Sequence, residues 1–369
     1  MSRPLEGITV VSIEQAVAAP LASARLRDAG ARVIKIERAE GDFARNYDAA
    51  AKGDSSYFIW LNQGKESWVI DFKTADGAKQ LHQLILNADV LIQNLGPGAI
   101  ERAGFGYKSL RQLYPTLITC DISGYGEVSA MQGMRAYDLL IQAEAGLAAV
   151  SGGADEMGRI GVSICDIGAG MTAHAAILEA LYRREKNAQG ASLAVSLFDV
   201  AAEWMTVPLV HSDYGKGAPT RQGLRHPSIS PYGAYQTGDG IQTLISIQNQ
   251  REWQRLCEQV LLAPQLFSDE KFLNNNSRVE NRDQLDEEIH SILNSLSAEE
   301  FRDRLKQHAI AFGAINEVSD LSRHPALRRR DAVNSTGETV PIPDHPVIWR
   351  DEDWRDSPGT PTVGRDSED

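Results

Sequence analysis

The sequence is poor in cysteine and in positive charge. Its three cysteines, Cys120, Cys165 and Cys257, are far apart and form no CxxC pair, which argues against a disulfide framework or a zinc site and fits a reducing cytoplasm. The 37 basic and 50 acidic residues give a net charge of -13, which argues against nucleic acid as a partner. No apolar stretch approaches the length of a membrane span, so we expect a cytoplasmic protein.

Several catalytic motifs are also missing. The loop "SIEQAVAAP" at 12–20 lacks the glycines that a dinucleotide pyrophosphate needs, and neither GxxxxGK[ST] nor GxSxG occurs. The eight histidines include no pair at helical spacing with a third ligand nearby, so we expect no metal. An anionic ligand must therefore be held by a local group of basic side chains and backbone N–H groups.

What is present favours a large α/β domain. At 369 residues the chain is long enough for a large and a smaller domain. Short β-branched runs alternate with helix-period stretches, and the runs lie at 8–13, 32–37, 67–73, 89–94 and 116–123. This alternation predicts βαβ units and a mainly parallel sheet, which places its ligand at the carboxyl ends of the strands.

The composition and the periodicity of the sequence change after residue 205. Residues 211–231 are rich in Gly, Pro, Ser and basic residues, as in a linker or site loop. A hairpin with Gly-Asp-Gly at its turn and helical patterns at 250–261 and 298–307 then predict a small α+β domain. We expect the Pro- and Asp-rich tail from about 340 to be draped over the surface or frayed.

Asp166 lies between an apolar, strand-like run and a long small-residue helix pattern. Its simplest interpretation is a helix N-cap. The same place also suits a nucleophilic carboxylate that attacks a thioester, and Gly168 and Gly170 would allow substrate or backbone to come close. Cys165 has no evident basic partner and is interpreted as a small buried residue.

Six stretches that occur in order carry a resemblance to one family: 4–20, 28–45, 55–73, 88–107, 122–147 and 165–184. Together they resemble the class III coenzyme A transferases of the CaiB/BaiF type, whose relatives include formyl-CoA transferase and the α-methylacyl-CoA racemases. The resemblance implies a large Rossmann-like α/β domain from residues 1–205 and 330–369, a linker at 206–228, and a small α+β domain at 229–329. It also implies a homodimer of interlocked rings, with a coenzyme A thioester as substrate and no prosthetic group.

The resemblance also implies the chemistry. The aspartate that matches Asp166 is the nucleophile, which forms a mixed anhydride with the acyl group and then an aspartyl-CoA thioester. Gln15 matches a residue that contacts the reacting acyl group. A poor nucleophile of this kind needs a water-poor site and donors for the developing oxyanion.

Further residues match family positions that contact the substrates. Basic side chains are wanted for the phosphates of CoA, and aromatic ones line the acyl and pantetheine channel. The implied CoA contacts are Arg38, Lys73, Asn94, Arg102 and Tyr137, and Tyr57 is an implied substrate contact.

Tyr137 bears on the choice between transferase and racemase. The racemases have a histidine at this position, which supplies the second acid/base group that racemization needs. An unperturbed phenol has a pKa near ~10 and is a poor base at neutral pH, so CoA transfer is favoured. A racemase or epimerase, and a catalytically silent CoA-binding homologue, remain the alternatives.

The branch of the family that uses succinyl-CoA and short dicarboxylates, such as itaconate, mesaconate or citramalate, resembles this sequence best. The distal carboxylate of such an acceptor needs a cation, for which Arg45, Arg221, Arg225 and His226 are candidates. The segment 220–228 has only Gly223 where the oxalate-specific members have a run of glycines, which puts oxalate in doubt. The C-terminal end of the chain also departs from the family pattern.

Overall fold

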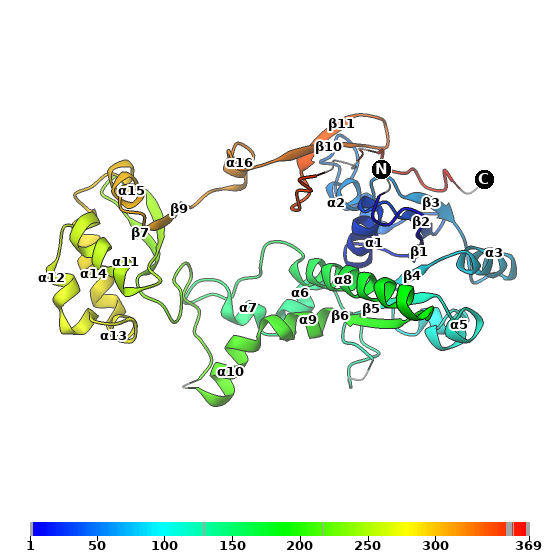
Figure 1. Ribbon diagram of the computed structural model, residues 1–369, viewed down its shortest axis with the longest axis horizontal. Helices are drawn as coiled ribbons and strands as arrows, with labels where there is room; N and C mark the ends of the chain where they lie inside the picture. Colours follow the sequence, from blue (N-terminus) through cyan, green and yellow to red (C-terminus); the bar gives the residue numbers. More distant parts are fainter. Residues whose placement is uncertain (1–2, 128–129, 216, 352–355, 357, 367–369) are drawn as a thin grey trace. The chain divides into compact units, whose positions relative to one another are not determined.

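The computed structural model describes residues 3–127, 130–215, 217–351, 356 and 358–366, and it contains two compact units (Figure 1). Unit 1 comprises Met1–Leu147, Ile160–Val207 and Arg328–Asp369, and unit 2 comprises Ala148–Arg159 and Pro208–Leu327. Two details differ from the expected domains. Residues 148–159 belong to unit 2, and the first part of the expected linker forms helix α10 (Thr206–Tyr214).

Unit 1 is built on a six-stranded sheet with the order β3-β2-β1-β4-β5-β6, in which every pair is parallel. The strands are β1 (Thr9–Ile13), β2 (Arg32–Glu37), β3 (Glu66–Val69), β4 (Val90–Gln93), β5 (Ile118–Ser123) and β6 (Ser192–Ser196). The predicted parallel sheet is confirmed. Because β1 has β2 on one side and β4 on the other, the strand order reverses beside β1, where open parallel sheets bind their ligands.

Helices cover both faces of this sheet. Alternate residues of one strand belong to different cores, with Val10 in one and Val11 in the other, as the period of two in a strand requires. Helices α1 (Ala18–Asp28) and α8 (Ile164–Asn187) pack on the first face. Helices α3 (Ala75–Leu86), α4 (Ala99–Arg102) and α5 (Tyr107–Leu113) pack on the second.

The remaining helices of unit 1 are short. They are α2 (Ser56–Leu61), α6 (Asp138–Glu144), α7 (Leu147–Val150), which runs into unit 2, and α9 (Leu197–Trp204). The tail forms a hairpin of β10 (Arg329–Val333) and β11 (Thr339–Pro343). The buried Thr360 accepts a hydrogen bond from Gln63, and Asp366 accepts one from the Ser67 N–H at 2.9 Å. Of the two alternatives expected for the tail, these residues are draped over unit 1 and not frayed.

Helix α8 meets the length and hydropathy of a membrane span, because it has 24 residues and contains an 18-residue window with a mean hydropathy of 1.3. The expectation that no stretch comes close to a span therefore does not hold for it. The helix buries Cys165, Ala169, Ala173 and Ile177 in the core of unit 1. These contacts make α8 a core helix of this unit.

Unit 2 has an antiparallel sheet of β7 (Tyr232–Gln236), β8 (Gln242–Ser246) and β9 (Ala311–Ala314). The predicted hairpin is the β7–β8 pair. Its helices are α11 (Gln250–Arg255), α12 (Gln265–Ser268), α13 (Asn275–Glu280), α14 (Arg282–Leu293), α15 (Ala298–Gln307) and α16 (Val318–Leu321). Trp253, Phe272 and Phe301 are fully buried in its own core, so unit 2 is an α+β structure with a separate hydrophobic centre.

Candidate active site

Asp166 lies inside α8, in its first turn. The helix begins at Ile164 and its N-cap is Ser163, so the interpretation of Asp166 as the N-cap is wrong. No strand precedes it, because residues 161–163 are irregular. Among the described residues nothing donates a hydrogen bond to the Asp166 carboxylate, so the helix itself does not use this group.

The carboxylate of Asp138 accepts a hydrogen bond from the first turn of α8, as the side chain of an N-cap residue would. Asp138, the first residue of α6, accepts a hydrogen bond from the Cys165 N–H at 2.8 Å and one from the Gln142 side chain at 2.7 Å. Burial raises the pKa of Asp166 to about 7, and the negative charge of Asp138 adds to the rise. Asp166 is therefore divided between its acid and its ionised form near neutral pH.

Cys165 is unsuited to nucleophilic chemistry. Burial raises the pKa of its thiol to about 12, with further increases from Asp138 and Asp166. The thiol is protonated at neutral pH, and the thiolate is the reactive form. The interpretation of Cys165 as a small buried residue agrees with this environment.

The segments that carry Gln15 and Asp166 meet in the interior of unit 1. Gln15 follows the end of β1, in the loop that leads to α1. Its neighbour Ala16, Tyr57 of α2 and Ile167 of α8 all pack on one small cluster, made of Val17, Leu21 and Leu61. Tyr57 and the chain neighbours of Gln15 and Asp166 thus share one apolar contact, which brings the three segments to one region.

Tyr47 is a member of this region that the sequence analysis missed. Its ring meets that of Tyr57 edge to face, with centroids 5.4 Å apart. Burial raises the pKa of Tyr47 to about 12, and the charges of Asp42 and Asp166 and the neighbouring Tyr137 raise it further. Tyr137 itself is 64% exposed at the start of α6. No sequence spacing connects these tyrosines, and only the fold brings them near Asp166.

The basic residues predicted to hold CoA lie at one edge of the sheet. Lys73 follows β3, Arg38 follows β2, and Arg102 lies on α4 after β4, so all three come after the carboxyl ends of parallel strands. All three are exposed. Within the described part of the chain, Arg38 and Lys73 make no side-chain hydrogen bond, and the Arg102 guanidinium donates to the Pro97 carbonyl at 3.3 Å. Such an edge offers cationic groups to an anionic ligand.

Two predicted residues of unit 1 have other partners. The Asn94 amide is bound to the main chain of Gln15 rather than directed outward. The Arg45 guanidinium forms two bonds to Glu37, at 2.6 and 3.0 Å, donates to the Pro361 carbonyl and lies 3.8 Å from the centre of the Phe58 ring. Arg45 would have to break this ion pair to bind a substrate carboxylate, so the structure gives it a structural role.

The other candidates for the distal carboxylate lie in unit 2. Arg225 pairs with Asp286 at 3.2 Å and with Asp283 at 3.4 Å. His226 stacks on Tyr232 with ring centroids 5.2 Å apart, and burial lowers its pKa. Arg221 donates to three main-chain carbonyls of the segment 149–154. Of the two candidate arginines that form ion pairs, Arg45 and Arg225, Arg225 has the more accessible charge, because its side chain is 43% exposed.

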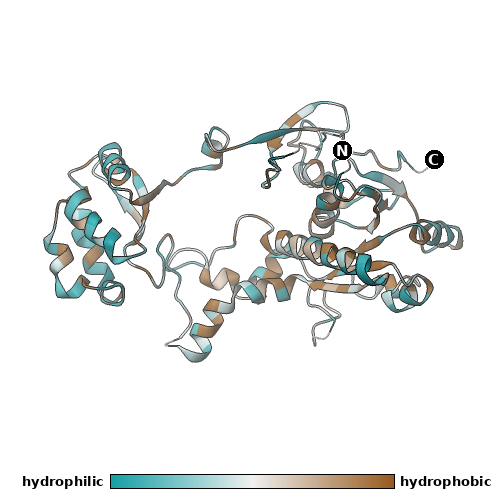
Figure 2. Cartoon of the chain, in the orientation of Figure 1, coloured by the Kyte–Doolittle hydropathy of each residue, from teal (hydrophilic) through white to brown (hydrophobic). Residues whose placement is uncertain are grey.

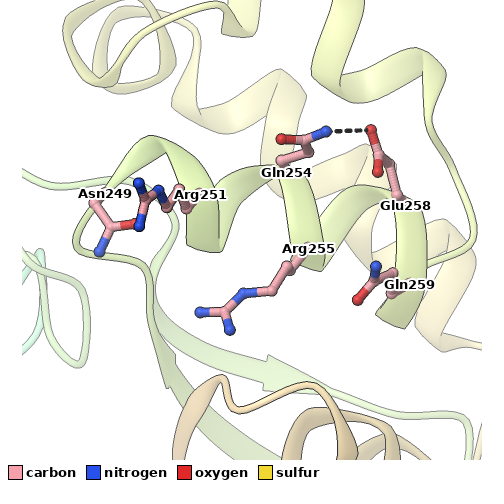
Figure 3. Close-up of a pocket in the computed structure, with 6 residues that line it drawn as sticks. All are labelled: Asn249, Arg251, Gln254, Arg255, Glu258 and Gln259. Atoms are coloured by element: carbon pink, nitrogen blue, oxygen red, sulfur yellow. Dashed lines mark hydrogen bonds between the residues drawn. The ribbon is translucent and has the colours of Figure 1, made fainter.

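A pocket of about 510 Å³ lies on α11 and the π-helix Leu256–Val260 that follows it (Figure 3). Its lining is polar and consists of Asn249, Arg251, Gln254, Arg255, Glu258 and Gln259. None of the predicted site residues lines it. Within the described part of the chain, no group of three His, Cys, Asp or Glu residues could hold a metal ion.

Comparison with known proteins supports a transferase. The model of CoA-transferase family III matches residues 5–367. Acetyl-CoA:oxalate CoA-transferase of Acetobacter aceti is 31% identical over 98% of this chain and 93% of its own length. Succinyl-CoA:glutarate CoA-transferase of Mus musculus is 31% identical over 86% and 73%, and succinyl-CoA:mesaconate CoA-transferase of Haloarcula hispanica is 28% identical over 90% and 86%.

A solved structure shares the fold. The crystal structure of a CaiB/BaiF family protein from Brucella suis matches with a TM-score of 0.84 and 29% identity, over 100% of this chain and 98% of that one. This likeness and the parallel sheet agree with the resemblance seen in the sequence. The chain belongs to CoA-transferase family III and is an enzyme of the CoA-transferase type.

Proposed function

We propose that this enzyme moves coenzyme A from succinyl-CoA to a short dicarboxylate such as itaconate, mesaconate or citramalate, with Asp166 as the covalent nucleophile. The observation that carries the proposal is the environment of Asp166. Its carboxylate has a pKa raised to about 7 by burial, accepts no hydrogen bond from the described residues, and lies next to the apolar cluster that also receives the Gln15 loop.

The reaction follows from this environment. The ionised Asp166 attacks the thioester carbonyl carbon, the C–S bond breaks, and a mixed anhydride and CoA thiolate result. The thiolate attacks the aspartyl carbonyl and releases the donor acid, which leaves an aspartyl-CoA thioester. The acceptor carboxylate opens this thioester, and the thiolate then takes the acceptor acyl group and frees Asp166. Weak solvation makes a carboxylate more reactive, and the Gln15 amide is suited to stabilise the oxyanions.

We assign CoA to the sheet edge that carries Arg38, Lys73 and Arg102, and the acyl group to the side of Tyr57 and Tyr137. The cationic groups suit the phosphates of CoA, which the net charge of -13 would otherwise repel. The aromatic surface beside Asp166 suits pantetheine and the acyl chain.

The choice of a dicarboxylate acceptor is supported by the names of the relatives. Their acceptors are oxalate, glutarate and mesaconate, which are all dicarboxylates. Arg225 is the cationic candidate for the distal carboxylate, whereas the lowered pKa of His226 leaves its imidazole uncharged at neutral pH.

We also propose a homodimer that works in a reducing cytoplasm. Met171, Leu178 and Tyr182 lie on one face of α8 and are exposed. Helix α10 has no buried residue although Val207 is apolar, and its ribbon carries brown, hydrophobic stretches in Figure 2. A second copy of the chain would cover such apolar surface. The three cysteines are free and buried, which suits a reducing compartment.

A panel of donors and acceptors tests the substrate proposal. Succinyl-CoA is incubated with itaconate, mesaconate, citramalate, glutarate and oxalate, with carnitine as the control, and new thioesters are identified by chromatography. We expect transfer to the four- and five-carbon dicarboxylates. Transfer to carnitine alone, or to none of the acids, would contradict the substrate assignment.

A further inference from the structure

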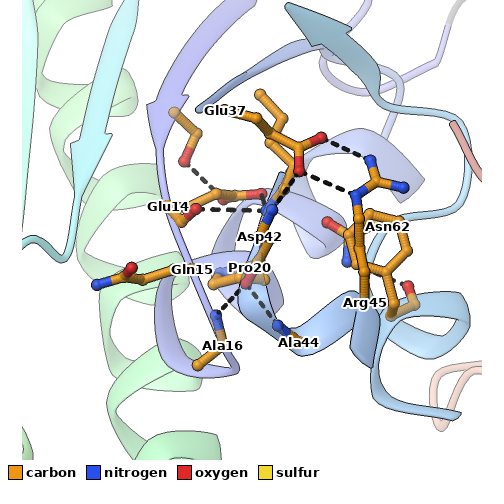
Figure 4. A network of polar contacts seen from close by, with 12 residues as sticks. Glu14, Gln15, Ala16, Pro20, Glu37, Asp42, Ala44, Arg45 and Asn62 are labelled. Carbon is orange, nitrogen blue, oxygen red and sulfur yellow. Dashed lines mark hydrogen bonds and ion pairs between the residues drawn. The ribbon is translucent and has the colours of Figure 1, made fainter. Parts of the chain in front are cut away.

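The loop that carries Gln15 has an unusual main chain. Ala16 has φ of 63°, a left-handed conformation that a residue with a Cβ seldom adopts. Such a conformation persists only where neighbouring groups fix it. The Gln15 side chain makes no hydrogen bond to the described residues, and in Figure 4 it points away from the polar network around it.

Asn94 holds this loop from one side. Its Oδ1 accepts from the Gln15 N–H at 2.9 Å, and its Nδ2 donates to the Gln15 carbonyl at 2.8 Å. The two bonds engage the donor and the acceptor of one residue's main chain, which fixes both the position and the orientation of residue 15. Asn94 follows the end of β4, the neighbour of β1, so a parallel strand pair sets this distance.

Asp42 holds the loop from the other side (Figure 4). Its Oδ1 accepts from the N–H groups of Ala16 at 3.2 Å and Ala44 at 2.9 Å, and its Oδ2 accepts from the Lys35 ammonium at 2.9 Å. Lys35 also reaches the carbonyl and the side chain of Glu14, each at 3.4 Å. Asp42 therefore holds the main chain of residue 16, next to residue 15, which Asn94 holds.

The network behind Asp42 is buried and balanced in charge. The side chains of Glu14, Lys35 and Lys65 are completely buried, and Lys65 binds Glu14 at 2.6 Å. With Asp42 they comprise two negative and two positive groups. The neighbouring lysines outweigh the effect of burial and lower the pKa of Glu14 to about 2, so this carboxylate stays ionised. Breaking such a network leaves an uncompensated buried charge, so the anchor on Ala16 is rigid.

We propose that Asn94 is a positioning residue for the reaction. It acts with the anchor at Asp42 to fix the main chain of residues 15–16 and so directs the Gln15 side chain toward the acyl group on Asp166. This inference rests on the proposed function of Gln15 and Asp166. It replaces the expectation that the Asn94 amide contacts CoA, because both ends of that amide are used by Gln15.

A double-mutant cycle tests the inference. The values of kcat and KM for acyl-CoA are measured for the wild type, Gln15→Ala, Asn94→Ala and the double variant. If Asn94 acts through Gln15, each single variant loses about 10- to 100-fold in kcat with little change in KM, and the double variant is no slower than Gln15→Ala. Asn87→Ala is the matched control and should retain wild-type kinetics, since among the described residues the exposed Asn87 amide donates to the Gln83 carbonyl alone.

Other results would overturn the inference in distinguishable ways. Effects that multiply in the double variant, a rise in KM for acyl-CoA, or wild-type kcat in Asn94→Ala would each contradict positioning and leave the role of Gln15 intact. Wild-type kcat in Gln15→Ala would contradict the proposed role of Gln15 as well. If Asn94→Ala does not fold, Asn94→Asp takes its place in the cycle, because it keeps the acceptor for the Gln15 N–H and loses the donor.

Discussion

At the residue scale, Asp138 and Asp166 have different tasks at the start of one helix. Asp138 accepts the Cys165 N–H, whereas the Asp166 carboxylate accepts no hydrogen bond from the described residues. The like charges interact in a place where burial already disfavours ionisation. In the proposed mechanism, a nucleophile with a pKa of about 7 should give the enzyme an acid limb in its pH profile.

This arrangement predicts a shift of that limb in Asp138→Asn. In the proposed mechanism the ionised form of Asp166 is the nucleophile, so kcat/KM should rise with pH through about 7 and level off above it. Removing the charge of Asp138 lowers the pKa of Asp166, and the limb should move to lower pH. The measurement is kcat/KM against pH, with Asp76→Asn on the exposed start of α3 as the control. An unchanged limb would show that Asp138 does not act on the titrating group.

The motif around Asp166 could be recognised from the sequence, but its surroundings could not. Asp138 and Tyr47 are 28 and more than 100 residues away in the chain, and only the packing of α6, α8 and the loop before α2 makes them its neighbours. The N-cap interpretation failed because the helix begins two residues before Asp166, and helix ends are the least certain part of a sequence pattern.

At the scale of elements, the site depends on the close packing of α8 on α1. A Cβ added at Gly170 would lie 2.5 Å from the Ala18 carbonyl oxygen, and one at Gly168 would lie 2.2 Å from the Trp204 ring. These glycines therefore serve contact between elements. The sequence analysis also allowed these glycines to let a substrate come close, but the contacts between helices are enough to explain both of them.

Gly170→Ala should destabilise the enzyme. The methyl group meets main chain, which cannot rotate away, so we expect a loss of about 1–3 kcal/mol in the free energy of unfolding. Gly133→Ala is the control, since nothing lies within 4 Å of a Cβ at that exposed position. Thermal unfolding of both variants checks this, and equal melting temperatures would mean that α8 and α1 can separate at no cost.

Most strands and helices of unit 1 were predictable because alternating β-branched runs and helix-period stretches have distinct periods. The contacts of the tail were not predictable. Residues 358–366 form hydrogen bonds to residues near 63 and 67. A Pro-rich segment has no sequence pattern that predicts contacts with residues so far away in the chain.

At the scale of the whole molecule, the exposed apolar face of α8 argues for a second copy of the chain. Light scattering should give twice the mass of the single chain, unchanged by dilution. Leu178→Arg should reduce that mass or the yield of folded protein, whereas Glu179→Arg, at the adjacent exposed position, should not. A single-chain mass for the active wild type would refute the homodimer.

The central claim is that Asp166 carries the acyl group and then CoA. It is tested most directly by incubating the enzyme with succinyl-CoA, adding hydroxylamine and analysing its peptides by mass spectrometry. Hydroxylamine attacks the aspartyl carbonyl of the anhydride or thioester, so the expected product is a hydroxamate at Asp166 that is absent in Asp166→Asn. Full turnover with an unmodified Asp166, or a hydroxamate at another carboxylate, would contradict the account.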